Sequence, residues 1–124
     1  MRDLARVGRL IAEGGARGSA QIVPEACIHD IAHNGEPHAW AAGDLASYFP
    51  GAPMRYRSQW YVHDFRVPAV FAIGIHGQYL LVDRQHGIVV AKVASQALPV
   101  DVERGLLTRN AVSQIVRVLA ASSG

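Results

Sequence analysis

Residues 71–83 read FAIGIHGQYLLVD, and this stretch decides the fold that we expect. Two apolar runs are separated by Gly74 and Gly77, which bracket an isoleucine and a histidine. Each run is typical of a β-strand, and glycine at the end of a strand marks a bulge, a tight turn or the close approach of another group. The stretch therefore predicts two strands of one sheet. It leaves open whether the glycines only shape a turn or also let the Ile75 amide face an anionic or carbonyl oxygen.

Strand-like patterns continue on both sides of this stretch. An aromatic-rich run precedes it, a turn is expected at residues 64–66, and the apolar run IVVAKV follows a hairpin turn at residues 83–87. Because the runs are apolar on both faces, the sheet should be covered on both sides. We predict an antiparallel sheet with strands near residues 56–62, 69–76, 79–83 and 88–94.

Helical patterns flank these strands. The first apolar residues recur at helical spacing up to Gly14, a second helix should run from Pro24 to His33, and Pro99 opens a long last helix. The proline-containing stretch 36–53 is expected to be irregular. Residues 1–124 are thus predicted to form a single α+β domain, an antiparallel sheet flanked by helices. The first helix, the sheet and the last helix should share one core through residues Leu4, Leu10, Phe71, Val90 and Ile115.

The composition excludes several classes of protein. Half of the 124 residues are hydrophobic and 18% are charged, which excludes a disordered chain. No apolar run reaches the roughly 18 residues of a transmembrane helix, so no membrane partner is expected. The net charge is +2 and the arginines are scattered, whereas a nucleic-acid-binding protein clusters them on one face. Since the N-terminus lacks the apolar core of a secretion signal, we expect a cytoplasmic location.

A search for nucleophiles gives a negative result. A Ser-x-x-Lys pair would place the two side chains one helical turn apart, so that the amine accepts the hydroxyl proton. Lys92 is the only lysine, and Val89 lies three residues before it, so this sequence cannot contain that pair. Cys27 and His29 are two residues apart and would point to different faces of a helix. Cys27 is therefore expected to be a small core residue.

A metal site is a weaker alternative. His29 and His33 are four residues apart on the expected second helix, which is the spacing of the zinc-binding His-Glu-x-x-His helix. Asp30 stands where that motif has glutamate, and Glu36 or His38 could supply a third ligand. The other interpretation is a solvated helix end, in which the C-terminal dipole favours His33. We expect no bound metal.

A family resemblance changes the balance of these interpretations. Residues 2–8, Gly14-Gly15 and residues 21–26 resemble serine hydrolases of the class C β-lactamase and penicillin-binding-protein superfamily. The run 71–83 looks like the aminohexanoate-dimer (nylon-oligomer) hydrolase branch of esterases and amidases, and the match continues through residues 89–96 and 99–101. The resemblance implies the C-terminal portion of a β-lactamase/transpeptidase-like fold, with no cofactor.

The resemblance also implies roles for individual residues. Ala72-Ile73-Gly74 falls on the family's Lys-Thr-Gly strand, and only Gly74 is retained. The backbone amide of Ile75 falls where the family forms half of its oxyanion hole. In a full-length relative a serine would attack the carbonyl of a small amide or ester substrate. The residues placed in or beside the substrate pocket are Gly74, His76, Gly77, Tyr56, Trp60 and Tyr61.

The resemblance shows what this sequence lacks. Family members also use Ser-x-x-Lys and Tyr-x-Asn motifs, and neither occurs here. The chain should therefore be inactive by that mechanism when alone. Two alternatives stay open, which are a non-catalytic binding or self-associating remnant and a small metal hydrolase centred on His29 and His33.

Overall fold

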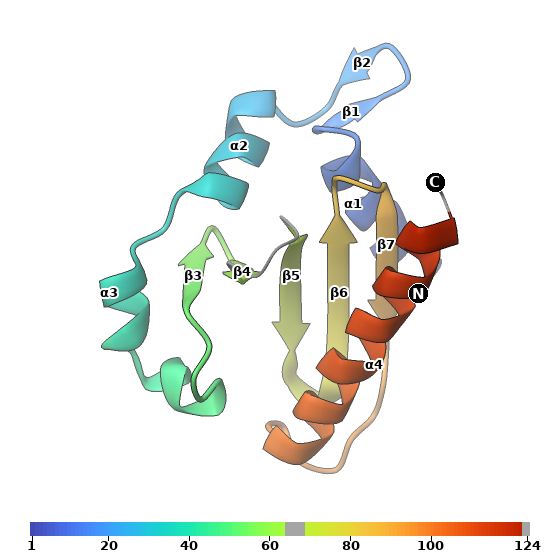
Figure 1. Ribbon diagram of the computed structural model, residues 1–124. Coiled ribbons are helices and arrows are strands. Elements are labelled where there is room, and N and C mark those ends of the chain that lie inside the picture. The colour runs from blue at the N-terminus through green and yellow to red at the C-terminus, as the bar shows by residue number, and fades with distance from the viewer. Residues whose placement is uncertain (64–68, 123–124) are drawn as a thin grey trace.

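The protein is built around one five-stranded antiparallel sheet, seen in the computed structural model of Figure 1, which describes residues 1–63 and 69–122. The spatial order of the strands is their order in the sequence, so each strand pairs with the next one along the chain. The predicted α+β fold with an antiparallel sheet flanked by helices is confirmed. The strands are β3 (Met54–Arg57), β4 (Trp60–His63), β5 (Ala69–Gly74), β6 (Gln78–Asp83) and β7 (Ile88–Lys92).

The prediction of one strand over residues 56–62 was wrong, because this run forms the β3–β4 hairpin. Ser58 and Gln59 make its two-residue turn, with φ values of 50° and 69°. Turns with two positive φ angles usually contain asparagine or glycine, so the sequence carries no turn signal here. The turn expected at residues 64–66 lies outside the described residues.

The remaining strands differ from the prediction mainly at their ends. β5 ends at Gly74, two residues earlier than predicted, because a single 3₁₀ turn, η2 (Ile75–Gly77), connects it to β6. β7 ends at Lys92 rather than at residue 94. Each of these strands therefore ends where its backbone stops pairing with the neighbouring strand. The apolar pattern of the sequence does not predict that point.

Helices cover both faces of the sheet, as expected (Figure 1). On one face, α1 (Arg2–Ala12) lies against β6 and β7, and α2 (Glu25–His33) lies against β4 and β5. On the opposite face lies the long helix α4 (Val102–Ser122). No helix among the described residues is long and apolar enough to cross a membrane.

The prediction of one shared core was wrong, because the sheet separates two cores. On the α1 side Leu4 packs against a cluster that contains Ile11, Ile28 and Leu80. On the α4 side Val112 packs in a cluster with Phe71, and Val90 lies against it. Successive side chains of a strand point to opposite faces, so one strand feeds both clusters. Ile115 is 45% exposed and Leu10 is only half-buried, so neither is a buried core residue as predicted.

Two regions carry more structure than predicted. A short hairpin of β1 (Ala16–Arg17) and β2 (Ala20–Gln21) replaces the expected loop. Residues 36–53, expected to be irregular, contain α3 (Pro37–Ala41) and η1 (Asp44–Tyr48). These helices are short, and their stability depends on tertiary packing such as the burial of Trp40 rather than on local periodicity.

The prediction of a buried Cys27 was also wrong. Helix α2 buries Ile28, Ile31 and Ala32, which recur at helical spacing, whereas Cys27 lies on the exposed side. The apolar character of a thiol does not tell which face of a short helix will meet the sheet.

Candidate active site

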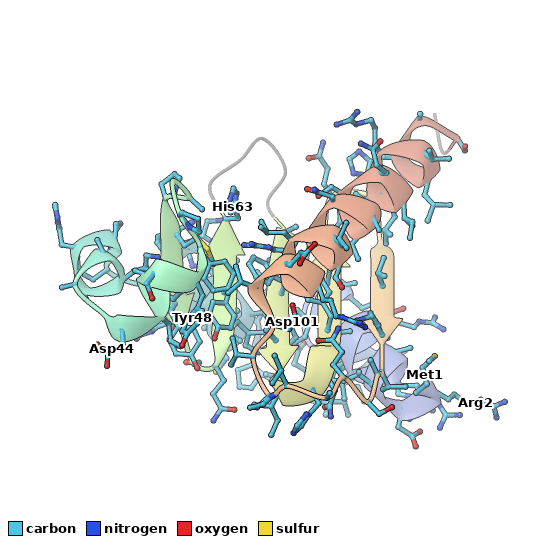
Figure 2. The ribbon with its side chains drawn as sticks, turned by 90° about the horizontal axis from the view of Figure 1, so that it is seen from below. Met1, Arg2, Asp44, Tyr48, His63 and Asp101 are labelled. Atoms are coloured by element: carbon cyan, nitrogen blue, oxygen red, sulfur yellow. The ribbon has the colours of Figure 1, made fainter. Side chains whose placement is uncertain are left out.

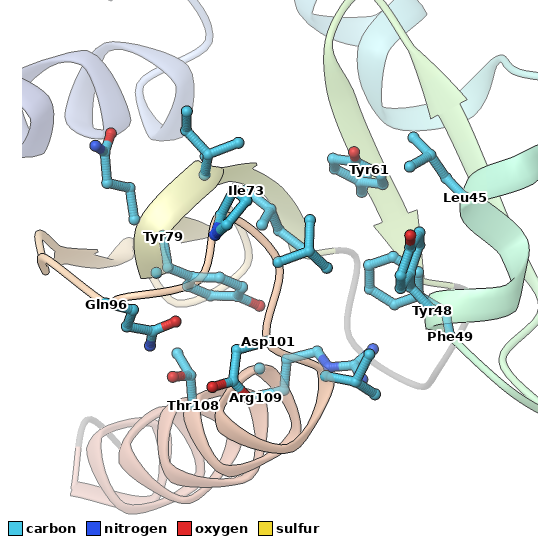
Figure 3. A pocket seen from close by; sticks show the side chains of 18 residues that line it. Leu45, Tyr48, Phe49, Tyr61, Ile73, Tyr79, Gln96, Asp101, Thr108 and Arg109 are labelled. Carbon is cyan, nitrogen blue, oxygen red and sulfur yellow. The ribbon is translucent and has the colours of Figure 1, made fainter.

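A pocket of about 210 Å³ opens at the end of β5, on the α4 side of the sheet (Figure 3). Its walls come from β4–β6, from η1, from residues 96–101 and from the first half of α4. Most of the surface is apolar, and a few polar groups converge on it, as is common for small-molecule sites. The lining residues that bear on function are Leu45, Tyr48, Phe49, Tyr61, Ile73, Gly74, Ile75, Gly77, Gln78, Tyr79, Gln96, Asp101, Thr108 and Arg109.

The second half of β5 is open along one edge. β6 pairs with the whole strand, from Ala69 to Gly74, whereas the register with β4 covers only Val70 and Phe71. Ile75 follows the last ladder pair, Gly74 with Gln78. Among the described residues, no backbone hydrogen bond outside the helices and strands involves the Ile75 amide, and the ladder pairs of β5 end at Gly74. An amide in this position is able to donate to a bound oxygen.

His76 anchors the turn after β5 instead of lining the pocket. Its φ is +59°, in the left-handed region that a non-glycine residue rarely adopts. The amide of His76 donates to the Pro99 carbonyl at 3.0 Å, the Gln96 amide donates to the His76 carbonyl at 3.1 Å, and Nδ1 of the ring lies 2.8 Å from the Gln96 carbonyl oxygen. The turn thereby holds residues 96–99, which form a wall of the pocket.

Gly77 is required at the same turn for two reasons. Its φ is +85°, and an added Cβ would lie 2.4 Å from the Gln96 side chain, which packs against the turn. Its carbonyl accepts a hydrogen bond from Lys92 Nζ at 2.9 Å. The only lysine of the sequence is therefore a structural partner of the turn.

The three aromatic candidates occupy different positions. Tyr61 lines the pocket and stacks on Phe71 with a centroid distance of 5.4 Å. Tyr56 lies opposite Tyr61 on β3, with ring centroids 4.7 Å apart, and supports it from outside the pocket. Trp60 points to the other face of the sheet, where it packs against the α1-side core. Adjacent residues of a strand cannot both face the pocket, so Tyr61 and Trp60 are separated.

Buried Tyr79 and half-buried Tyr61 remain neutral in the pocket. Burial raises the pKa of Tyr79 far above its ordinary value, and burial followed by the neighbouring Tyr56 raises the pKa of Tyr61. A tyrosine that acts as a base needs a lowered pKa. Tyr61 and Tyr79 are therefore suited to packing and to donating hydrogen bonds.

Several pocket residues were missed by the sequence reasoning. Leu45 and Tyr48 come from η1 in the stretch expected to be irregular, and Arg109 comes from α4 (Figure 3). Arg109 lies 34 residues beyond Ile75, and no local pattern marks either one as a partner of the other. The two aromatic residues at positions 48 and 49 were the only sequence feature that could have indicated this part of the pocket.

The histidine pair on α2 gives no support to the metal alternative. The rings of His29 and His33 are stacked with centroids 4.1 Å apart, and Nδ1 of His33 lies 3.1 Å from the His29 carbonyl oxygen. Asp30 is held by Arg57, whose Nε lies 2.7 Å from Oδ2. Within residues 1–63 and 69–122, no three potential ligands form a group that could hold a metal ion.

The sheet, its two helical layers and the pocket at the end of β5 define the class of protein, an α+β protein with a β-lactamase-like fold. The chain has a TM-score of 0.72 with a solved structure from Bacillus anthracis, a candidate 6-aminohexanoate-dimer hydrolase. The two sequences are 26% identical, and the match covers 94% of this chain and 28% of the other.

The sequence comparison agrees with the fold. The chain is 33% identical over 94 residues to the 6-aminohexanoate-dimer hydrolase of Paenarthrobacter ureafaciens, a match over 76% of this chain and 24% of the hydrolase. No family model matches the sequence. This chain is therefore a relative of the 6-aminohexanoate-dimer hydrolases, as its residues predicted, and it spans about a quarter of their length.

Proposed function

We propose that this chain forms the oxyanion side of a serine hydrolase site that cleaves a small amide or ester. The observation that carries the proposal is the Ile75 amide, which follows the open end of β5 and borders the pocket. In acyl transfer, such a donor stabilises the charge that develops on the carbonyl oxygen in the transition state. The pocket beside it would hold the apolar part of the substrate.

The name of the Paenarthrobacter relative supports an amide substrate class. That protein is named as a 6-aminohexanoate-dimer hydrolase, and an amide bond is the link that an amino acid forms with a second copy of itself. The serine and its base would come from a Ser-x-x-Lys motif that this sequence does not contain. By itself the chain should bind the substrate without hydrolysing it.

A chimera tests the proposed role of Ile75. The 94 matched residues of the Paenarthrobacter hydrolase are replaced by those of this chain, and ester and amide hydrolysis are measured. Ile75→Pro removes the N–H and should lower kcat by about 10²–10³-fold. The substitution suits the backbone, because Gly74 is extended (φ −107°, ψ 162°) and Ile75 opens the 3₁₀ turn.

The matched control is Ile75→Val, which keeps the amide and should retain most of the activity. Equal kcat values for the two folded variants, checked by their melting temperatures, would refute the oxyanion role. A fluorophosphonate probe on the unmodified chain gives a second check. Stoichiometric labelling of one of its own serines would refute the proposal that the nucleophile lies elsewhere.

A further inference from the structure

A second cavity lies between the sheet and the second half of α4, and the proposed reaction does not use it. Its volume is about 770 Å³, within the roughly 300–1,000 Å³ of sites for small molecules. Figure 2 shows His63, at the end of β4, and the long helix α4 on the same side of the sheet. The lining residues that carry the argument are Phe71, Tyr79, Asp83, His86, Ser113 and Arg117.

The floor of the second cavity is aromatic, whereas its rim is polar. Phe71 and Tyr79 are buried, and their rings are stacked with centroids 5.8 Å apart. His86, Ser113 and Arg117 are exposed and lie where the cavity meets the solvent. A ligand with a flat apolar ring and a charged head would therefore place its ring on the floor and its head at the rim.

The rim carries two cations on one stripe of α4. Arg109, Ser113 and Arg117 follow one another at intervals of four residues, which places them on one face of the helix. The two arginines lie about 12 Å apart along the helix axis, with Ser113 midway. Among the described residues, no carboxylate forms an ion pair with either arginine. Arg109 also lines the first pocket, where its Cζ lies 4.5 Å from the centroid of the Phe49 ring, so Arg117 is the cation that belongs to the second cavity alone.

The carboxylate of the second cavity does not oppose an anion, because hydrogen bonds already occupy both of its oxygens. Asp83 is fully buried, and its Oδ1 accepts from the amides of Gln85 and His86 at 2.9 and 3.2 Å. Nδ1 of the His86 ring lies 2.7 Å from Oδ2, so Nε2 is the ring nitrogen left for a ligand. A protonated His86 donates from Nε2 to an anion, while the Asp83 carboxylate stabilises the imidazolium.

We propose that the second cavity binds a small aromatic phosphate monoester, with its ring on the aromatic floor and its phosphate held by Arg117, Ser113 and His86. A phosphate monoester carries about −1.5 to −2 charges at neutral pH and has three acceptor oxygens, which matches donors that come from both α4 and the β6–β7 turn. A carboxylate has two oxygens and one charge, so it would leave part of this donor set unused. The inference is independent of the oxyanion role of Ile75, since the second cavity does not include that residue.

The test uses the unmodified chain and three probes, which are 2-naphthyl phosphate, 2-naphthol and inorganic phosphate. Binding is followed by amide shifts in ¹H–¹⁵N spectra. The ester should shift the amides of His86 and Ser113 and leave that of Ile75 unchanged. It should also bind at least about tenfold more tightly than either other probe, because charge-assisted hydrogen bonds and ring burial act together. An ester that binds no more tightly than naphthol or than inorganic phosphate, or that shifts Ile75 instead of His86, would refute the proposal.

A pair of variants on α4 tests the role of the cation. Arg117→Gln should weaken binding of the ester about tenfold and leave binding of naphthol unchanged, and Arg117→Lys should retain part of the affinity. Arg104→Gln is the matched control, since Arg104 lies on the same helix and does not line the second cavity. Dispersed spectra show that each variant is folded. If the Arg117→Gln and Arg104→Gln variants bind the ester equally well, the assignment of the site is wrong.

Discussion

His76 shows how one strained residue positions a site without touching its ligand. The left-handed conformation of an L-residue costs about 1–2 kcal/mol, and asparagine tolerates it better than most side chains. Hydrogen bonds to Gln96 and Pro99 compensate this cost and fix the wall of the pocket. The strain is therefore maintained by tertiary contacts and not by the local sequence.

We expect His76→Ala to destabilise the fold by about 1–2 kcal/mol, because it loses the ring hydrogen bond and the residue still has to adopt a positive φ. His76→Asn should cost less, since asparagine accepts the left-handed conformation. Denaturant unfolding measures both values. His38→Ala, on the exposed surface of α3, is the control. Equal stability of the alanine and asparagine variants would contradict the role of backbone strain.

At the scale of the elements, an ion pair between Arg57 and Asp30 joins the edge strand β3 to helix α2. Arg57 contacts both oxygens of Asp30, at 2.7 and 3.1 Å, and Asn34 donates to the same carboxylate at 2.7 Å. The Arg57 hydrogen bonds, and then that of Asn34, hold the pKa of Asp30 below its ordinary value. The same carboxylate that was considered for a metal site therefore has a structural role.

This link predicts an acid-dependent loss of stability. A carboxyl whose pKa is lower in the folded state stabilises the fold above its unfolded pKa, about 3.9, and loses that contribution as the pH falls through the folded value. The melting temperature of Asp30→Asn should lie below that of the unmodified protein at neutral pH, and the gap should narrow below about pH 4. A gap that stays constant from pH 7 to pH 3 would contradict this account.

At the scale of the whole molecule, α4 leaves a large apolar surface uncovered. Leu107 is 63% exposed and Val118 is 62% exposed, and the two are separated by three helical turns on the same side of the helix. Ile115 and Leu119 are also exposed by nearly half. Several large apolar side chains left exposed on one helix are typical of an interaction face.

We therefore expect the chain to self-associate through α4. Sedimentation velocity over a range of concentrations should show a dimer or larger species. The double substitution Leu107→Glu and Val118→Glu should shift the population to monomer, whereas Ser113→Glu, elsewhere on the helix surface, should not. A monomer at every concentration would refute this expectation.

Much of the architecture was determined by the sequence alone. The change from helical to strand periodicity near residue 56, and its reversal at Pro99, predicted the sheet and the helices on both sides of it. The glycines around Ile75 and His76 marked the position of the turn. These features are encoded within a few neighbouring residues, because side-chain period and turn chemistry restrict the backbone locally.

Only the tertiary structure decided the pocket and the division of the core. Whether Tyr61 or Trp60 faces the pocket depends on the register of β4, and a shift of one residue would exchange them. Arg109 meets the end of β5 only because α4 packs across the sheet, and Cys27 is exposed because of the face that α2 turns inward. Such contacts join residues far apart in the chain, and the free energy that selects them comes from packing the whole molecule, which no local pattern contains.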